Sequence, residues 1–143
     1  MKIKNIKDKL FLIAAVGTSI FLLFFVVTCA WIGFDVKSQC QVAKRTYGGE
    51  SARGETSCVE ALITLLNDEN KSYRQRNSAV WALGQLGDSR ALPVLESYYT
   101  DQIPPRESLD KSISQYGLKK AINLTSGGFN MTAIFWRSGL LDN

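Results

Sequence analysis

The sequence predicts an all-α protein, in which an N-terminal transmembrane helix leads into a short stack of about four to five amphipathic helices. Three observations carry this prediction. Residues 10–34 form a run of 25 residues without a charged side chain. Later segments repeat their apolar residues at the spacing of one helix face. Glycine, asparagine and proline breakers separate these segments, and no segment alternates as a strand would.

The apolar run at 10–34 is long enough to cross a bilayer. A helix rises about 1.5 Å per residue and the hydrocarbon core is about 30 Å thick, so about 20 residues suffice. We expect the run to be retained as a signal anchor that contacts membrane lipid, with Trp31 at the interface. Two alternatives stay open, namely cleavage of a signal peptide after Ala30 and a lipoprotein signal ending at Cys29.

Positive charge is concentrated at the amino terminus. Residues 1–9 have a net charge of +3, whereas the whole chain has +4. The nearly balanced remainder argues against nucleic acid as a partner. Because positive residues favour the cytoplasmic side, we predict that 1–9 is a basic cytoplasmic leader. The protein is then a single-pass membrane protein whose helical domain is periplasmic or extracellular.

The helical domain is predicted at 35–126, with an apolar C-terminal tail at 127–143. Ser57 and Glu60 have the spacing of a capping box. The tail is expected to fold back on the last helix, the alternative being contact with the membrane interface. The expected helices are, in order, 36–47, 58–66, 73–86, 91–99 and 108–124. The apolar face expected for the last helix consists of Leu109, Ile113, Tyr116 and Ala121.

Residues 76–95 resemble a HEAT repeat of the kind found in phycobilisome-lyase proteins. The resemblance rests on Arg-x-x-Ala at 76–79, Ala-Leu-Gly at 82–84 and Leu-Gly-Asp at 86–88. With 61–68 included it covers about 40 residues, which is close to the length of one such repeat. It implies a HEAT-like α-solenoid, and the overall layout is also similar to that of small bacterial membrane proteins with HEAT repeats.

The resemblance implies structural roles for four residues. In such repeats an arginine and an aspartate tie turns together, a role that falls to Arg76 and Asp68. Gly84 is small enough to let paired helices approach closely. Gly87 follows the helix at 73–86, where a left-handed cap is expected. Since only one full repeat is recognisable, we expect the flanking helices to cap the stack.

A polar stripe on the helix at 73–86 is the leading candidate for partner binding. Tryptophan beside arginine is typical of a protein-binding hot spot, although Trp81 can instead be half-buried against the next helix. Tyr98 and Tyr99 are adjacent, so one of them must point away from the core, and Tyr98 is a further candidate. The stripe consists of Arg74, Asn77, Trp81 and Gln85.

The chain contains no histidine, the commonest general base and metal ligand. Its cysteines lack zinc spacing, and its carboxylates form no acid/base pair. We therefore expect no catalytic residue, no cofactor and no metal site. Cys40 and Cys58 can form a disulfide in an oxidising compartment, the alternative being a buried and a surface thiol.

These features predict a membrane-anchored module that binds an unknown protein partner and has no catalytic activity. Two alternatives come from other classes of function. One is an accessory ligand-binding or lyase-like subunit, as the resemblance implies. The other is a structural subunit of a larger membrane complex, since Gly17 and Ser19 would allow another helix to pack closely.

Overall fold

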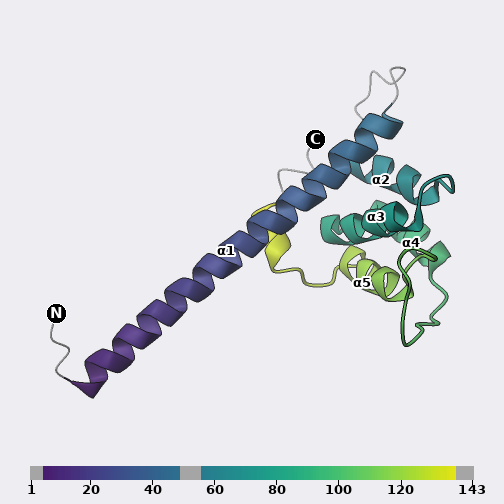
Figure 1. Cartoon of the computed structure of the whole chain (residues 1–143). Coiled ribbons are helices and arrows are strands. Elements are labelled where there is room, and N and C mark those ends of the chain that lie inside the picture. The colour runs from purple at the N-terminus through teal and green to yellow at the C-terminus, as the bar shows by residue number, and fades with distance from the viewer. Residues whose placement is uncertain (1–4, 49–55, 138–143) are drawn as a thin grey trace.

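The computed structural model describes residues 5–48 and 56–137, and within them it is all-helical, which confirms the predicted fold class (Figure 1). The predicted leader at 1–9 and the predicted tail at 127–143 lie partly outside the described residues. The elements are α1 (Ile6–Tyr47), α2 (Cys58–Asn67), α3 (Tyr73–Leu86), η1 (Ser89–Ala91), α4 (Leu92–Tyr98), α5 (Gln115–Thr125) and η2 (Thr132–Phe135), where η marks a 3-10 helix.

The long helix α1 dominates the shape of the molecule as a rod that projects from the other helices (Figure 1). It spans 42 residues, and among the described helices it alone is long and apolar enough to cross a membrane. The predicted boundary between residues 34 and 35 does not interrupt it. No proline stands there, and the nearby Gly33 lies inside the helix without breaking it, so the helix continues to its cap at Gly48.

The second half of α1 is part of the domain core. Val36, Cys40 and Ala43 are buried, at the i, i+4 and i+7 spacing of one helix face. This face packs against α2 and α3, which also pack on each other. Helix α3 packs in turn against α5, and α5 against α4. The helices α1, α3 and α5 thus form one row, with α2 and α4 beside it.

Local signals explain where the middle helices begin and end. Ser57 and Glu60 form the predicted capping box of α2, and Ser72 with Gln75 forms a second one at the start of α3. Gly87 ends α3 at a φ of 62°, the left-handed conformation that glycine adopts without a steric cost. Most of the apolar core lies behind these caps and includes Leu62, Leu66, Leu83, Leu86, Leu95 and Leu118.

Helix α5 begins seven residues later than predicted. Asn77 of α3 donates hydrogen bonds to the carbonyl oxygens of Leu109 and Ser112, at 3.0 and 2.9 Å, and accepts one from Ser114 N at 2.8 Å. Because this side chain satisfies the backbone there, the segment has no need of helical hydrogen bonds. The expected apolar face is half right, since Ala121 is buried and Ile113 packs against the core, whereas Leu109 and Tyr116 are about half exposed and Leu118 is buried instead.

The expectation that the apolar tail folds onto the last helix is wrong. Element η2 packs against the first half of α1, where the rings of Phe135 and Phe25 meet edge to face at 5.7 Å. Two hydrogen bonds to the end of α3 direct the tail there. Asn130 donates to the Gln85 side chain at 2.9 Å, and Arg137 donates to the Gln85 carbonyl at 2.9 Å.

Candidate functional site

A groove runs along the face that α1, α3 and α5 share. Its first hollow, of about 460 Å³, is lined by α1, α3 and the loop before α5. Its second hollow, of about 290 Å³, continues between α3 and α5. Asn77, Trp81 and Leu109 line both hollows, which makes them one surface that we call the α3 groove. The first hollow is lined by Asp35, Gln39, Arg74, Asn77, Ser78, Trp81 and Leu109.

Trp81 is the apolar centre of the α3 groove. Its side chain packs against the buried core, and the residue is partly buried. Leu109 lies beside it with 51% of its surface exposed, because the loop that carries it is not helical. A large aromatic side chain anchored in the core and flanked by an exposed leucine can receive an apolar side chain from another molecule.

Charged groups stand at the rim of the α3 groove. Arg74 forms a bidentate pair with Asp110, at 2.9 and 3.3 Å, with both side chains mostly exposed. The Arg74 guanidinium lowers the pKa of the Asp110 carboxyl by hydrogen bonding and by its charge. Asp35 of α1 lines the same hollow. Such a pair at the surface contributes little stability, so Arg74 is free to exchange its partner.

The structure brings four of the five candidate binding residues together. Arg74, Asn77 and Trp81 line the first hollow, and Gln85 lines the second. Asn77 also holds the groove wall through its three hydrogen bonds to the loop before α5. Tyr98 does not belong to the groove. Its hydroxyl instead donates to the side chain of Asn67 at 3.0 Å.

Arg76 is bonded inside the domain, as its structural role requires, but it does not pair with Asp68. Its Nε donates to the Leu66 carbonyl at 2.8 Å, which satisfies a carbonyl in the last turn of α2. Its guanidinium also lies 5.7 Å from the ring centres of both Tyr73 and Tyr98. The residue is buried, so this hydrogen bond forms away from water. Arg76 therefore ties the turn between α2 and α3 to α4.

The Asp68 carboxylate accepts hydrogen bonds from groups other than Arg76. It ends α2 and accepts a hydrogen bond from the backbone N–H of Asn70 at 3.0 Å, in the turn that leads to α3. Its other carboxylate oxygen accepts from the hydroxyl of Tyr47 at 2.6 Å. The turn thus directs the carboxylate toward the end of α1 and away from Arg76. Asp68 thus ties its turn to the long helix rather than to Arg76.

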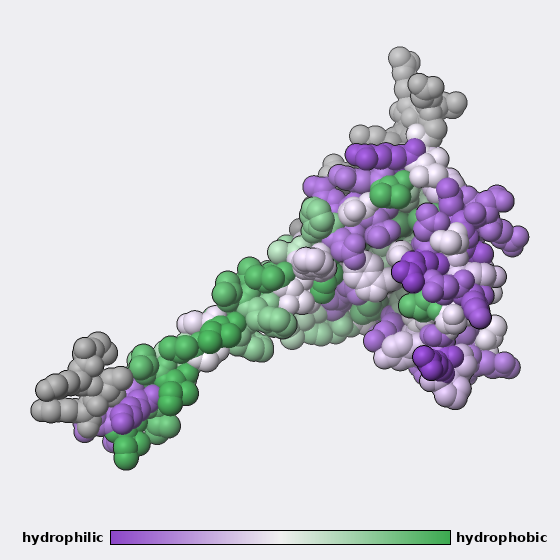
Figure 2. Space-filling model, viewed as in Figure 1, coloured by the Kyte–Doolittle hydropathy of each residue, from purple (hydrophilic) through white to green (hydrophobic). Residues whose placement is uncertain are grey.

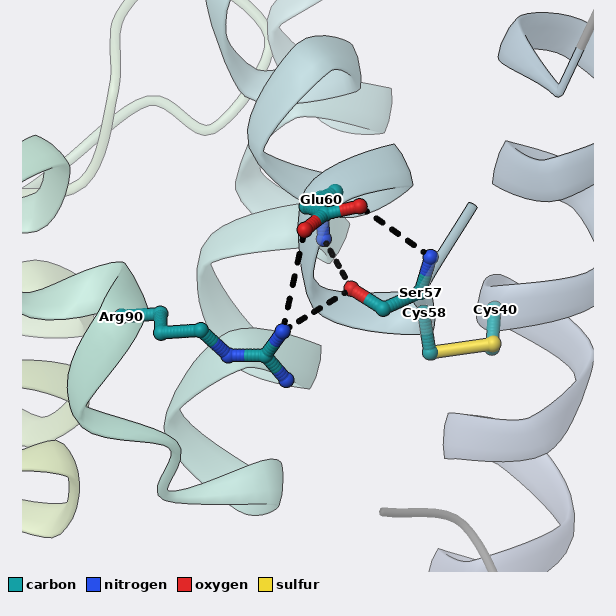
Figure 3. The surroundings of a disulfide bond; sticks show 5 residues. All are labelled: Cys40, Ser57, Cys58, Glu60 and Arg90. Atoms are coloured by element: carbon teal, nitrogen blue, oxygen red, sulfur yellow. Dashed lines mark hydrogen bonds and ion pairs between the residues drawn. A yellow bond between two sulfur atoms is a disulfide. The ribbon is translucent and has the colours of Figure 1, made fainter. Parts of the chain in front are cut away.

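The sulfur atoms of Cys40 and Cys58 are joined as a disulfide, with a Cα–Cα distance of 5.2 Å (Figure 3). Cys40 lies on α1 and Cys58 is the first residue of α2. The bridge therefore connects the rod to the domain beside the α2 capping box. Figure 3 shows Arg90 reaching the same place, where its guanidinium lies 3.3 Å from Ser57 Oγ and 3.7 Å from Glu60 Oε1.

Arg90 is a residue that sequence reasoning missed. It also pairs with Asp88 at 2.8 Å, which lowers the pKa of that carboxyl. Asp88 caps η1, so the arginine links the start of η1 to the start of α2. The sequence pattern that could have indicated this role is an arginine two residues after a capping aspartate. Its second partner, the capping box, is about thirty residues away in the sequence, which local spacing cannot reveal.

Gly84 marks the closest approach of two helices. A Cβ atom added there would lie 2.7 Å from the Cα of Ala121 on α5, nearer than side chains pack. The small residue that the resemblance implies at 84 is therefore needed for α3 to contact α5. Among residues 5–48 and 56–137, no group of three or more His, Cys, Asp or Glu side chains is placed to hold a metal ion.

The fold and the groove define a helical-repeat protein that carries a long apolar helix at its amino end. Residues 40–109 match the family model of HEAT repeats. The match begins inside α1 and ends before α5, so the repeats include α2, α3 and α4. The two helices that frame the α3 groove at its edges therefore lie partly or wholly outside the recognised repeats.

One curated relative is a deoxyhypusine hydroxylase from Schizosaccharomyces pombe. This chain is 35% identical to it over 72 residues, which is 49% of this chain and 23% of that protein. The chain therefore matches less than a quarter of the relative's length. No solved structure matches this chain.

Proposed function

We propose that this protein is a membrane-anchored HEAT-repeat module that binds a protein partner in the α3 groove and has no catalytic activity of its own. The observation that carries this proposal is Trp81. It packs against the core, is partly exposed at the centre of a groove, and is flanked by exposed Leu109 and Arg74. This combination of a core-anchored aromatic side chain with exposed neighbours is typical of a binding hot spot.

The first half of α1 supports the membrane anchor. Large apolar side chains point outward along it, with Ile13, Phe21 and Phe24 each about two-thirds exposed or more. In water such a surface would favour aggregation, whereas in a bilayer it is solvated. The hydroxyl-bearing residues of the run bond back to carbonyl oxygens four residues earlier at 2.8 Å, so none needs water; they are Thr18, Ser19 and Thr28.

Contacts between α1 and the tail favour a retained anchor over a cleaved signal peptide. Cleavage after Ala30 would remove Phe25 and Cys29, which line one wall of the hollow against Phe135. It would also remove the part of α1 that the Phe135 ring of η2 contacts. A segment that the folded domain uses as a packing surface is expected to stay attached.

The disulfide supports the proposed orientation. Such bonds persist in oxidising compartments, and Cys40 and Cys58 are joined on the domain side of the apolar run. With the basic residues of 1–9 on the cytoplasmic side, the domain faces the periplasm or the exterior. A membrane-impermeant thiol reagent tests this in intact cells. It should label the pair only after an impermeant reductant is added, and labelling only after permeabilisation would reverse the orientation.

The partner that fits the α3 groove presents one apolar anchor residue to Trp81 and Leu109. Around that anchor it offers a carboxylate or carbonyl oxygen to Arg74, in exchange for Asp110. Because Asn77 is already engaged by the loop, it shapes the groove rather than binding the partner. The volume of the first hollow, about 460 Å³, is enough for one or two side chains and not for a whole domain.

The test is affinity capture of the full chain from detergent extracts, with two groove variants. Trp81→Ala removes the anchor, and Ser78→Arg fills the first hollow without touching the core. Both should lose the partner that the natural chain retains, with unchanged helical content by circular dichroism. Tyr116→Ala, which removes an exposed aromatic side chain outside the groove, is the control. Undiminished capture by both groove variants would overturn the proposed site.

The hydroxylase relative favours a second candidate, in which the chain is a repeat subunit that serves an enzyme. The support is weaker, because the match covers 23% of that protein and this chain has no histidine. Addition of the purified chain to a deoxyhypusine hydroxylase and its protein substrate in the presence of dioxygen tests it. A change in the rate at which the substrate gains an oxygen atom, followed by mass spectrometry, would favour this candidate over the adaptor.

A further inference from the structure

The tail presents a row of large apolar side chains to the outside. Phe129, Met131, Ile134 and Phe135 are each more than half exposed. They lie within η2 or just before it, and η2 packs on α1. A soluble domain of this size rarely leaves four such side chains together on one short segment. We call residues 129–136 the tail ledge.

Two contacts fix the position of the ledge along the axis of α1. The ring of Phe135 meets that of Phe25, and Trp136 lies against Gly33, where an added Cβ would be 3.0 Å from the tryptophan side chain. Both contacts fall inside the apolar run at 10–34. If the hydrocarbon core begins at Leu10, its 30 Å reaches about residue 29, and the ledge lies within about 6 Å of that level.

The apolar run is longer than a bilayer requires, and the ledge explains the excess. About five residues, up to Phe34, extend beyond the predicted hydrocarbon limit. Trp31, which is 74% exposed, lies in this excess at the height of the ledge. Aromatic residues concentrate at this depth of a membrane, because their rings are apolar and their edges tolerate headgroups.

The surface of the ledge is continuous with that of the anchor. In Figure 2 the hydrophobic colour covers the rod and continues onto the adjoining edge of the domain. Between η2 and α1 there is also a largely apolar hollow of about 420 Å³, bounded by Leu22, Cys29 and Phe135 among others. This hollow is open to the side and is wide enough for part of an acyl chain.

Apart from the indole Nε1 of Trp136, which is buried without a partner in the part of the chain that the structure describes, the polar side-chain atoms of the ledge are bonded within the protein. The Asn130 side-chain oxygen accepts from the hydroxyl of Thr132 at 2.8 Å and from Ala133 N at 3.3 Å. Arg137, which follows the ledge, turns inward and donates to the Gln85 carbonyl at 2.9 Å. A segment whose backbone and side chains are bonded in this way can enter a layer poor in water at low cost.

We propose that the tail ledge is a second membrane contact, in which residues 129–136 insert into the interfacial layer of the bilayer that α1 crosses, with phospholipid acyl chains in the hollow beside η2. The inference rests on the proposed membrane anchor. Two contacts at one height fix the domain against the membrane surface, whereas a single helix would leave it free to rotate and tilt.

The test uses the three tryptophans of the full chain, Trp31, Trp81 and Trp136, as depth reporters. Single-tryptophan variants, made by Trp→Phe changes at the other two positions, are reconstituted in phosphatidylcholine vesicles that contain lipid brominated near the headgroup end of the acyl chain. Trp31 and Trp136 should be quenched at least about twofold more than Trp81, which serves as the control within the domain.

The possible outcomes separate the two proposals. Quenching of Trp31 while Trp136 matches Trp81 would overturn the ledge and leave the anchor in place. Absence of quenching at all three positions would overturn both. In the variant that keeps Trp136, the change Ile134→Asp should reduce quenching, because a carboxylate resists insertion. Val42→Asp, at an exposed apolar position of α1 beyond the run, should leave it unchanged.

Discussion

The hydroxyl of Tyr47, the last residue of α1, donates a 2.6 Å hydrogen bond to Asp68, the residue that ends α2. The bond joins the far end of the long helix to the turn between α2 and α3, 21 residues further along. Burial and this carboxylate raise the pKa of Tyr47 to about 12, and the same bond lowers the pKa of Asp68. It is the second link, after the disulfide, between α1 and the repeats.

This bond predicts a loss of stability in alkali. Because the folded state holds the Tyr47 proton more tightly than the unfolded state, the contribution is complete below pH 10 and is lost as pH rises toward 12. Tyr47→Phe should therefore flatten the decline of the melting temperature across this window. The slope should not vanish, since the pKa of Tyr99 is also raised by its bond to Asp101. An unchanged slope in Tyr47→Phe, equal to that of the control Tyr116→Phe, would contradict the prediction.

The disulfide predicts sensitivity to reductant. Its sequence separation is 18 residues, and closing a loop of that length stabilises a domain by about 3 kcal/mol. Paired Cys40→Ser and Cys58→Ser changes, or reduction of the natural chain, should lower the free energy of unfolding by about that amount in denaturant titrations. Cys29→Ala keeps both bridging residues and should lose stability on reduction as the natural chain does. Reductant-independent unfolding would show that the bridge is not formed.

At Gly84, one added methyl group should be enough to push α3 and α5 apart. In Gly84→Ala the new Cβ meets backbone of Ala121, which cannot rotate away, so we expect a loss of about 1–3 kcal/mol from overpacking. Gly17→Ala is the matched control, because nothing lies within 4 Å of the added atom. Thermal unfolding followed by circular dichroism compares the two. Equal melting temperatures would mean that α3 and α5 do not approach as described.

Substitutions of Arg76 and Arg74 in α3 are expected to affect different properties, the first stability and the second partner binding. Arg76→Ala leaves the Leu66 carbonyl without its buried donor, and we expect a loss of about 1–3 kcal/mol of stability. Arg74→Ala breaks only an exposed pair and should leave the stability nearly unchanged. Capture of the partner should show the reverse, since Arg74 lies at the rim of the α3 groove and Arg76 does not. Loss of capture without loss of stability in Arg76→Ala would place the binding surface elsewhere.

The groove could be predicted only in part from the sequence. Arg74, Asn77 and Trp81 share one stripe of α3, and helical spacing is enough to place them together. The opposite wall comes from Asp35 and from Leu109, which approach α3 only once α1 and the loop before α5 are packed. Tyr98 was a poor candidate, because its contacts with Asn67 and Arg76 join residues far apart in the chain.

The features of this protein that follow from the sequence alone are local ones. The apolar run at 10–34, the capping box at Ser57 and the left-handed cap at Gly87 each depend on a few neighbouring residues, whose chemistry acts without the rest of the fold. The tertiary structure decided the late start of α5, which Asn77 sets from more than thirty residues away, and the position of the tail on α1. It also gave Asp68 its partner, because a carboxylate bonds the donor that packing brings nearest, and here that donor is Tyr47.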